Sequence, residues 1–206
     1  YMKLKLNQIR DPFRQLICEY SLDGCADLNV QLKMIVGELR LADPNGVIKS
    51  NSNGWHSPDG FHMQDLPAVK KLNQLFYSSI GNYIQQYDKK FDLTHFNIKL
   101  MSWANLNNLG GGNITHLHPN SLISGTYYVK VPAQNVPKIR FYNTSGIQYL
   151  KNISDLGRSF AQGAFSFTPK EGDLILFPSN IFHSVDTNQN DEERVSIAFN
   201  AYLEKK

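Results

Sequence analysis

The chain has 206 residues, of which 41% are hydrophobic and 12% aromatic, and its formal net charge is +3 at pH 7. This length suits one domain that buries a core without disulfide or metal staples, and the aromatic content is too high for a disordered chain. No long basic stripe and no apolar run of membrane-spanning length occurs, which argues against nucleic-acid and membrane partners.

Two cysteines, Cys18 and Cys25, lie near the start of the chain. Their spacing of seven does not form a zinc knuckle, and the sequence has no second cysteine pair, so we interpret them as free thiols. Free thiols, together with the lack of a signal-peptide pattern, predict a reducing, cytoplasmic location.

Two helices are expected in the first half of the chain. Apolar residues recur at helical spacing from Asp27 to about Leu41, and a turn-forming segment, 43–46, follows. The second pattern begins at Asp65, the expected N-cap, and continues on one face to Tyr87. We interpret the aromatic side chains on that face as core residues and not as a cofactor site.

The hydrophobic period changes from a helical to an alternating pattern near Asn97. Short runs rich in Val, Ile, Phe and Tyr follow, and turns separate them, as is typical of β-strands. Strands that follow helices predict an α+β fold in which the strands close into a sandwich or barrel. The expected strands are 97–103, 121–131, 138–142, 164–168, 173–177 and 194–202.

We therefore expect a single domain over residues 1–206, with a helical part over about 1–96 and a strand-rich core over about 97–206. The stretch between Pro132 and Lys170 is long for a connection, and we interpret it as the place of a loop that covers substrate.

The histidines of the second half suggest a metal site. His116 and His118 lie two residues apart, so on an extended segment both imidazoles point to the same side and can bind one ion, such as Fe, Zn, Cu or Ni. His183 follows an apolar run and Pro178, which places it at a strand exit. An ordinary core strand followed by a surface histidine is the alternative interpretation.

A second group of residues suits the binding of an anion. Arg194 and Ser196 share one face of the last expected strand, and a guanidinium beside a hydroxyl can hold a carboxylate with two hydrogen bonds. The alternative is a surface arginine that pairs with the acidic residues 191–193.

The order of these signals resembles the Fe(II)/2-oxoglutarate-dependent oxygenases. In that superfamily two histidines and an acidic residue hold iron on a double-stranded β-helix, and an Arg-x-Ser downstream of the distal histidine binds the far carboxylate of 2-oxoglutarate. More narrowly, the chain resembles a family of bacterial and phage 2-oxoglutarate oxygenases over about residues 98–203. The segments that carry this resemblance are 116–119, 124–129, 177–178 and 196–200, with a looser match at Trp55-His56-Ser57.

The resemblance implies a jelly-roll, cupin-like double-stranded β-helix core that the N-terminal helices buttress. It implies Fe(II) as cofactor and 2-oxoglutarate and dioxygen as partners. A phage origin would make the expected location the host cytoplasm. The implied metal ligands are His116, His118 and His183, and the implied co-substrate residues are Arg194, Ser196, Tyr127 and Asn105.

The chain departs from the superfamily at His118, where an acidic residue is usual. In a rival ligand set only one of His116 and His118 binds the metal, and Asp186 or water completes the site. Tyr127 and Tyr128 point to opposite sides of a regular strand, so only one of them can reach the co-substrate. Asn200 shares a strand face with Arg194 and can also look inward.

The expected activity is hydroxylation of a substrate, coupled to the decarboxylation of 2-oxoglutarate. The sequence leaves that substrate open between a protein side chain and a small metabolite. One alternative is a cupin-like binding protein without turnover, against which the Arg194-x-Ser196 pair argues. Another is a dioxygenase with three histidine ligands that does not use 2-oxoglutarate.

Overall fold

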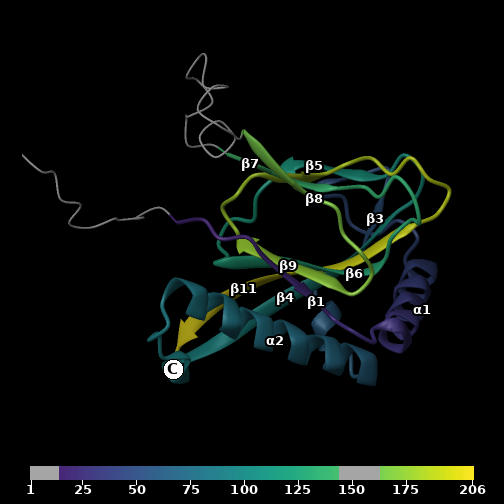
Figure 1. Ribbon diagram of the computed structural model, residues 1–206. Coiled ribbons are helices and arrows are strands. Elements are labelled where there is room, and N and C mark those ends of the chain that lie inside the picture. The colour runs from purple at the N-terminus through teal and green to yellow at the C-terminus, as the bar shows by residue number, and fades with distance from the viewer. Residues whose placement is uncertain (1–13, 144–162) are drawn as a thin grey trace, which may run out of the picture.

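The computed structural model describes residues 14–143 and 163–206 of the chain. Two antiparallel sheets face each other, and two long helices lie against the outer side of one of them (Figure 1). These helices are α1 (Ala26–Ala42) and α2 (Pro67–Tyr87), and two short 3-10 helices, η1 (Phe61–Met63) and η2 (Leu93–His95), complete the helical part.

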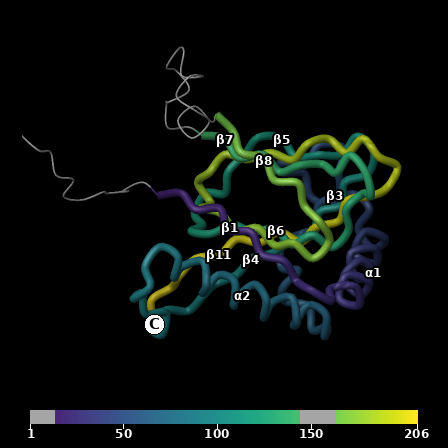
Figure 2. The backbone as a smooth tube through the Cα atoms, viewed as in Figure 1, coloured from purple at the N-terminus to yellow at the C-terminus, as the bar shows by residue number. Residues whose placement is uncertain are grey.

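The larger sheet has six strands in the order β1-β9-β6-β11-β4-β3. Its last strand in sequence lies between two earlier strands, so distant parts of the chain meet in its centre, as Figure 2 shows. The strands are β1 (Cys18–Ser21), β3 (Trp55–His56), β4 (Phe96–Asn107), β6 (Ile123–Lys130), β9 (Asp173–Pro178) and β11 (Arg194–Lys205).

The smaller sheet has five strands in the order β2-β5-β10-β7-β8. These strands are β2 (Asn51–Ser52), β5 (Gly112–His116), β7 (Ile139–Tyr142), β8 (Ala164–Phe167) and β10 (His183–Val185). Among the described strands from β4 onward, consecutive strands belong to different sheets, except that β7 and β8 lie in the same sheet.

The main core lies between the larger sheet and the helices. Alternate residues of β11, such as Ile197 and Phe199, are fully buried there, and the rings of Phe199 and Phe76 of α2 lie 4.4 Å apart. The expected apolar face of α2 packs into this core, although Tyr87 at its end is exposed. A smaller apolar cluster around Phe141 and Phe177 fills one part of the space between the two sheets.

The change from helices to strands near residue 97 is confirmed, because β4 begins at Phe96. The ranges 173–177 and 194–202 are strands as predicted. The first part of the chain is not only helical, however. It also contains β1 and β3, which belong to the larger sheet, and β2, which belongs to the smaller sheet. Each of these strands has four residues or fewer, too few to show an alternating pattern.

The predicted substrate-covering loop falls largely on residues 144–162, which lie outside the described residues. None of the helices that the structure describes is long and apolar enough to cross a membrane.

Candidate active site

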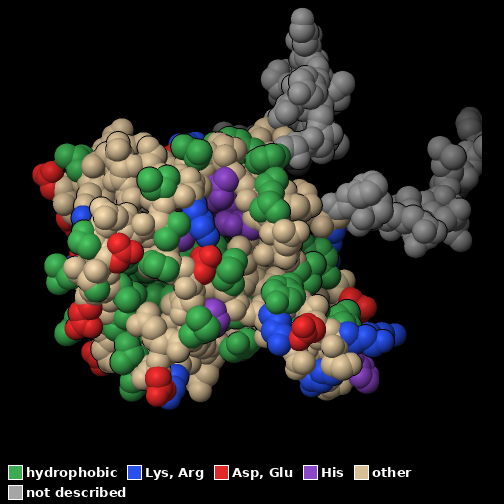
Figure 3. Space-filling view, turned by 180° about the vertical axis from the view of Figure 1, so that it is seen from behind, with side chains coloured by type: hydrophobic (Ala, Val, Ile, Leu, Met, Phe, Trp, Pro, Cys, Tyr) green, Lys and Arg blue, Asp and Glu red, His purple; other side chains and the backbone are tan. Residues whose placement is uncertain are grey.

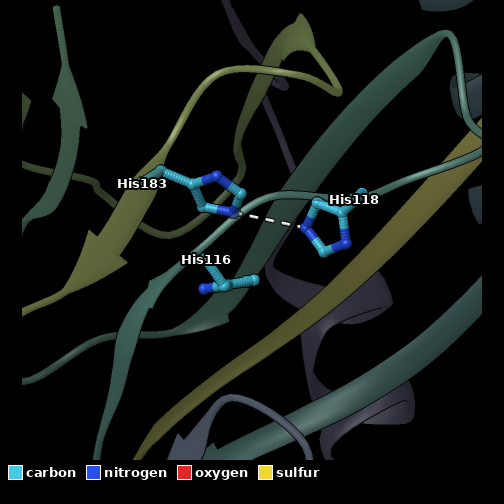
Figure 4. A group of neighbouring side chains, drawn as sticks. All are labelled: His116, His118 and His183. Atoms are coloured by element: carbon cyan, nitrogen blue, oxygen red, sulfur yellow. Dashed lines mark hydrogen bonds between the residues drawn. The ribbon is translucent and has the colours of Figure 1, made fainter. Parts of the chain in front are cut away.

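The three predicted metal ligands lie together on the smaller sheet. His116 ends β5 and His183 begins β10, and the two residues are direct partners in the antiparallel pairing, so their side chains lie on the same side. His118 lies two residues beyond β5, where its backbone N–H donates to the carbonyl of Ser179 over 2.9 Å. One ligand nitrogen of each histidine lies within 4.8 Å of the others, and the three rings point toward a common space in Figure 4.

Backbone carbonyls set the protonation of two of these rings. Nδ1 of His116 lies 2.8 Å from the carbonyl oxygen of Ile114, and Nδ1 of His183 lies 3.0 Å from that of Ile181. A carbonyl can only accept, so each Nδ1 must carry the hydrogen and each Nε2 is left with a free lone pair. This is the arrangement in which protein histidines bind metals.

The Nε2 atoms lie close to one another or to a hydroxyl group. Nε2 of His116 lies 3.3 Å from the hydroxyl of Ser50, and Nε2 of His118 lies 3.2 Å from Nε2 of His183. Because Nε2 of His183 has no hydrogen, the contact with His118 is satisfied only if His118 donates or if a cation lies between the rings.

Burial keeps the cluster uncharged. It lowers the pKa of His116, and it lowers the pKa of His118 to about 4 and of His183 to about 3, with the charge of His116 adding to the effect on both. At neutral pH all three imidazoles are therefore neutral, which is the form that binds metal. Three neutral imidazoles suit Fe, Zn, Cu or Ni, so the donor set fits an iron ion.

The rival ligand set with Asp186 is not supported by the geometry. Both carboxylate oxygens of Asp186 accept from the guanidinium of Arg140, one of them from Nη2 over 2.9 Å. Asp186 does not belong to the cluster that the three histidines form.

A cavity of about 430 Å³ lies between the sheets beside the histidines. The smaller sheet contributes His116 and His183 to its wall, and the larger sheet contributes Arg194 and Ser196. The predicted metal ligands and the predicted carboxylate-binding residues therefore line the same cavity. Figure 3 shows a group of histidine side chains together at the surface on one face of the molecule, with basic side chains close by.

Arg194 is a buried cation without an anionic partner. It is 2% exposed, its Nη1 donates to the hydroxyl of Ser196 over 3.1 Å, and its Nε has no hydrogen-bond partner. It forms no ion pair with a carboxylate of the described residues, and burial lowers its pKa. A buried and unpaired charge costs several kcal/mol, on the order of 3–5 when its partner is missing. The site therefore favours an anionic ligand.

The structure corrects the orientation expected for Tyr127. Its hydroxyl donates to Oδ1 of Asn29 on helix α1 over 2.7 Å, so it lies on the helix side of the sheet, away from the cavity. Tyr128 instead lies on the inner side, with the Arg194 guanidinium 5.0 Å from its ring centre. The pairing explains this, because Tyr128 and not Tyr127 lies opposite Ser196. The Tyr128 hydroxyl is buried and makes no hydrogen bond of good geometry, and burial raises its pKa while the nearby Arg194 guanidinium partly offsets that rise.

The two asparagines lie on the inner face of the larger sheet as expected. Asn105 is opposite Ser196 in the pairing and lines the cavity, and its Oδ1 has no partner. Asn200 also lines the cavity, but its Oδ1 accepts from the hydroxyl of Ser124 over 2.7 Å. The carbonyl oxygen of Asn105 is thus unpaired but sealed from solvent, while that of Asn200 is already bonded.

Two further residues line the cavity that the sequence did not indicate as site residues, His56 and Trp103. Their rings stack with centres 5.5 Å apart, and Trp103 also lies 5.6 Å from His118. Trp103 is two residues before Asn105 and therefore lies on the same face of an extended strand. The alternating pattern could have identified it as a residue of the cavity wall. His56 belongs to a strand of only two residues and offers no such signal beyond the Trp55-His56-Ser57 stretch.

Residues 101–200 match the model of a family described as "Putative 2OG-Fe(II) oxygenase". The matched region contains the three histidines, Arg194 and Ser196. Comparison with curated proteins by sequence gave no match.

Solved structures of similar fold include two prolyl hydroxylases. A prolyl-4-hydroxylase from Pseudomonas putida superposes with a TM-score of 0.61 at 15% identity, over 92% of each chain. A prolyl hydroxylase from Trichoplax adhaerens, bound to a fragment of the hypoxia inducible factor oxygen degradation domain, gives 0.59 at 14% identity, over 90% of this chain and 83% of that one. HygX from Streptomyces hygroscopicus, with nickel and 2-oxoglutarate bound, gives 0.60 at 9% identity, over 90% and 82%.

Proposed function

Since residues 101–200 match the model of a 2OG-Fe(II) oxygenase family, we propose that this protein is an Fe(II)- and 2-oxoglutarate-dependent hydroxylase. Its metal is held by His116, His118 and His183, without a protein carboxylate. The observation that carries this assignment is the unpaired, buried guanidinium of Arg194 in the same cavity as three neutral imidazoles.

The core is, in this proposal, a double-stranded β-helix within a single domain over residues 1–206. Two facing antiparallel sheets support it, as does the way the chain changes sheet at nearly every step from β4 to β11. The helices α1 and α2 cover the outer side of the larger sheet and keep its strands in place.

Four inward-facing residues of β11 and its neighbouring strands have a role in this proposal. Arg194 and Ser196 hold the far carboxylate of 2-oxoglutarate, and that carboxylate neutralises the buried guanidinium. Tyr128, and not Tyr127, supports this pair, because its ring lies against the guanidinium on the inner side of the sheet, although Tyr128 is not part of the cavity wall. Asn105 offers a further polar contact beside Ser196.

The cavity is electrostatically suited to a dianion. Arg194 and Lys49 line it, and none of its described wall residues is Asp or Glu. With three neutral ligands, the bound cation keeps its full charge and adds to the attraction. When bound, Fe(II) supplies the activation of dioxygen that couples 2-oxoglutarate decarboxylation to substrate oxidation.

The primary substrate is a protein side chain or a small metabolite. Solved structures of similar fold contain both kinds of ligand: a peptide fragment in the Trichoplax adhaerens complex and hygromycin B in a HygX complex. The lack of an acidic metal ligand favours one rival function, a dioxygenase that does not use 2-oxoglutarate.

Binding of 2-oxoglutarate to an Arg194→Ala variant tests the proposal. Loss of a charge-assisted hydrogen bond should weaken binding by about 1.5–3 kcal/mol, or roughly 10- to 150-fold. Titration calorimetry of the nickel-loaded protein measures the change, and unchanged nickel content shows that the metal site is intact.

Arg140→Ala is the matched control, because this arginine bonds Asp186 and does not line the cavity. Equal affinity of wild type and Arg194→Ala would remove Arg194 from the co-substrate site. A wild-type protein that binds iron but not 2-oxoglutarate would favour the rival dioxygenase.

A further inference from the structure

His56 is a buried histidine in the cavity wall that neither the metal site nor the co-substrate site uses. It is 3% exposed and belongs to β3, at the edge of the larger sheet. Its Nδ1 lies 2.5 Å from the carbonyl oxygen of Ser57, so that nitrogen carries the hydrogen. Nε2 is therefore a free acceptor.

This acceptor opens to the cavity. Nε2 has no hydrogen-bond partner among the described residues, and it is not among the unpartnered side-chain atoms that are sealed from solvent. Since His56 is otherwise buried and lines the cavity, a ligand can contact Nε2 from the cavity. A ligand that donates to Nε2 from the cavity makes a hydrogen bond that the described residues leave unmade, so this position favours a donor.

The ring is held in a fixed orientation. It stacks on Trp103 with an angle of 10° between the ring planes, and the backbone carbonyl of His56 accepts from the N–H of Val47 over 2.9 Å. Gly46 approaches so closely that a Cβ there would lie 2.5 Å from the His56 carbonyl oxygen. A fixed acceptor loses little conformational entropy when a ligand binds.

The location of His56 separates it from the co-substrate. His56 pairs with Asn105, which pairs with Ser196, so His56 is two strands away from the carboxylate-binding residues. Neighbouring strands lie about 4.8 Å apart, which gives roughly 10 Å between the backbones of His56 and Ser196. A carboxylate at Arg194 cannot also reach His56.

Charge limits what can bind beside His56. Lys49 lines the same part of the cavity and pairs with Asp59 over 3.0 Å, while no Asp or Glu of the described residues lines the cavity. Burial lowers the pKa of His56, so its ring is neutral at pH 7. A cationic donor would be repelled by Lys49, Arg194 and the bound metal ion.

We propose that His56 binds the primary substrate and selects one that presents an uncharged hydrogen-bond donor, an amide N–H or an alcohol O–H, next to the face of Trp103. The inference rests on the proposed function, because it takes the Arg194 end of the cavity as the place of 2-oxoglutarate. His56 is in this role a specificity residue, and it does not contact the metal.

Ligand-detected NMR titrations test this inference on the zinc-loaded protein with 2-oxoglutarate. The probes are small carboxamides and alcohols, each with a partner that lacks the donor: the N,N-dimethyl amide or the methyl ether. Wild type should prefer the donor probe by about 2- to 10-fold, the value of one hydrogen bond. The amide and alcohol series show which of the two donors is preferred.

Three variants complete the experiment. His56→Phe keeps a ring over Trp103 but has no acceptor, so it should bind both members of each pair equally. His56→Gln retains an acceptor oxygen and should recover part of the preference. His95→Phe removes an exposed histidine outside the cavity and should behave as wild type.

The outcomes separate this inference from the proposed function. Binding of 2-oxoglutarate is measured in the same samples and should be unchanged in His56→Phe. If 2-oxoglutarate binds but wild type shows no preference for donor probes, or His56→Phe keeps that preference, the inference is overturned alone. If wild type does not bind 2-oxoglutarate, the proposed function fails, and the inference fails with it.

Discussion

The two faces of the larger sheet are made from the same strands, but one face packs against the helices and the other lines the cavity. On its outer face, Val195, Ile197 and Phe199 of β11 pack against α1 and α2 in the main core. On its inner face, Arg194 and Ser196, which flank Val195 in the same strand, line the cavity. The outer face thus supplies stability, and the inner face holds polar groups that lower stability until a ligand satisfies them.

This comparison shows how one strand can carry a buried cation. The backbone of β11 is fixed by pairing with β4 along its whole length and with β6 from Val195 to Ala201. The apolar side chains of the outer face add hydrophobic stabilisation to that pairing. Arg194 can therefore stay in place without an anionic partner of its own.

The largest expected effect is on the outer face. Phe199→Ala removes a fully buried ring that contacts Phe76, and it should lower the free energy of unfolding by about 3–5 kcal/mol. Urea unfolding measures the loss. Nickel affinity of the folded fraction should not change, and a large loss of nickel affinity would show that the two faces are not independent.

Removal of a metal ligand should act on the inner face alone. His183→Ala should reduce iron affinity by more than about 100-fold, because loss of residues that merely orient ligands already costs 10- to 100-fold. His116→Ala and His118→Ala should follow the same direction. Metal content after dialysis measures this.

Asp186→Asn is the control for these three variants, since Asp186 bonds Arg140 and not the cluster. If His118→Ala retained full iron while Asp186→Asn lost it, a site with two histidines and one carboxylate would replace the site with three histidines.

The metal-free protein should lose stability as the pH falls below about 6.5. Unfolded histidines bind protons from that pH downward, whereas the folded protein keeps His118 neutral to about pH 4 and His183 to about pH 3. The unfolded state therefore binds more protons in this window, and stability falls with pH. For His183 the loss between pH 6.5 and 4.5 is on the order of 2 kcal/mol.

Thermal unfolding at a series of pH values measures this loss. His183→Phe removes one of the titrating groups and should make the profile less steep in that window, with the contribution of His118 remaining. An equally steep profile in this variant would assign the pH dependence to other groups.

The smallest expected effects separate the two tyrosines. Tyr127→Phe loses the hydrogen bond to Asn29 and should lower stability by about 0.5–1.5 kcal/mol without changing 2-oxoglutarate affinity. Tyr128→Phe should weaken 2-oxoglutarate binding instead, and removal of its unpartnered hydroxyl should not reduce stability. Calorimetry and urea unfolding of both variants give a direct comparison, and the reverse result would return Tyr127 to the pocket.

The sequence by itself predicted the features that depend on local spacing. An interval of two residues predicted that His116 lies with His118, and Arg194 with Ser196, because a strand repeats every two residues. For Arg194 and Ser196 the strand β11 provides this, whereas His118 lies beyond β5 and is held by a backbone hydrogen bond to Ser179. The change of hydrophobic period near residue 97 likewise marked the first long strand, β4.

Only the tertiary structure decided which side of a strand faces the cavity. The alternation of side chains along a strand predicts that Tyr127 and Tyr128 lie on opposite faces of the sheet. The pairing of Tyr128 with Ser196 and the position of α1 determine that Tyr128 is the one on the inner face. Asp186 is three residues from His183 in sequence, yet Arg140 on the neighbouring strand binds it. His56 joins the cavity through a two-residue strand whose partner lies about fifty residues away in the sequence. These contacts are long-range, so local periodicity carries no information about them.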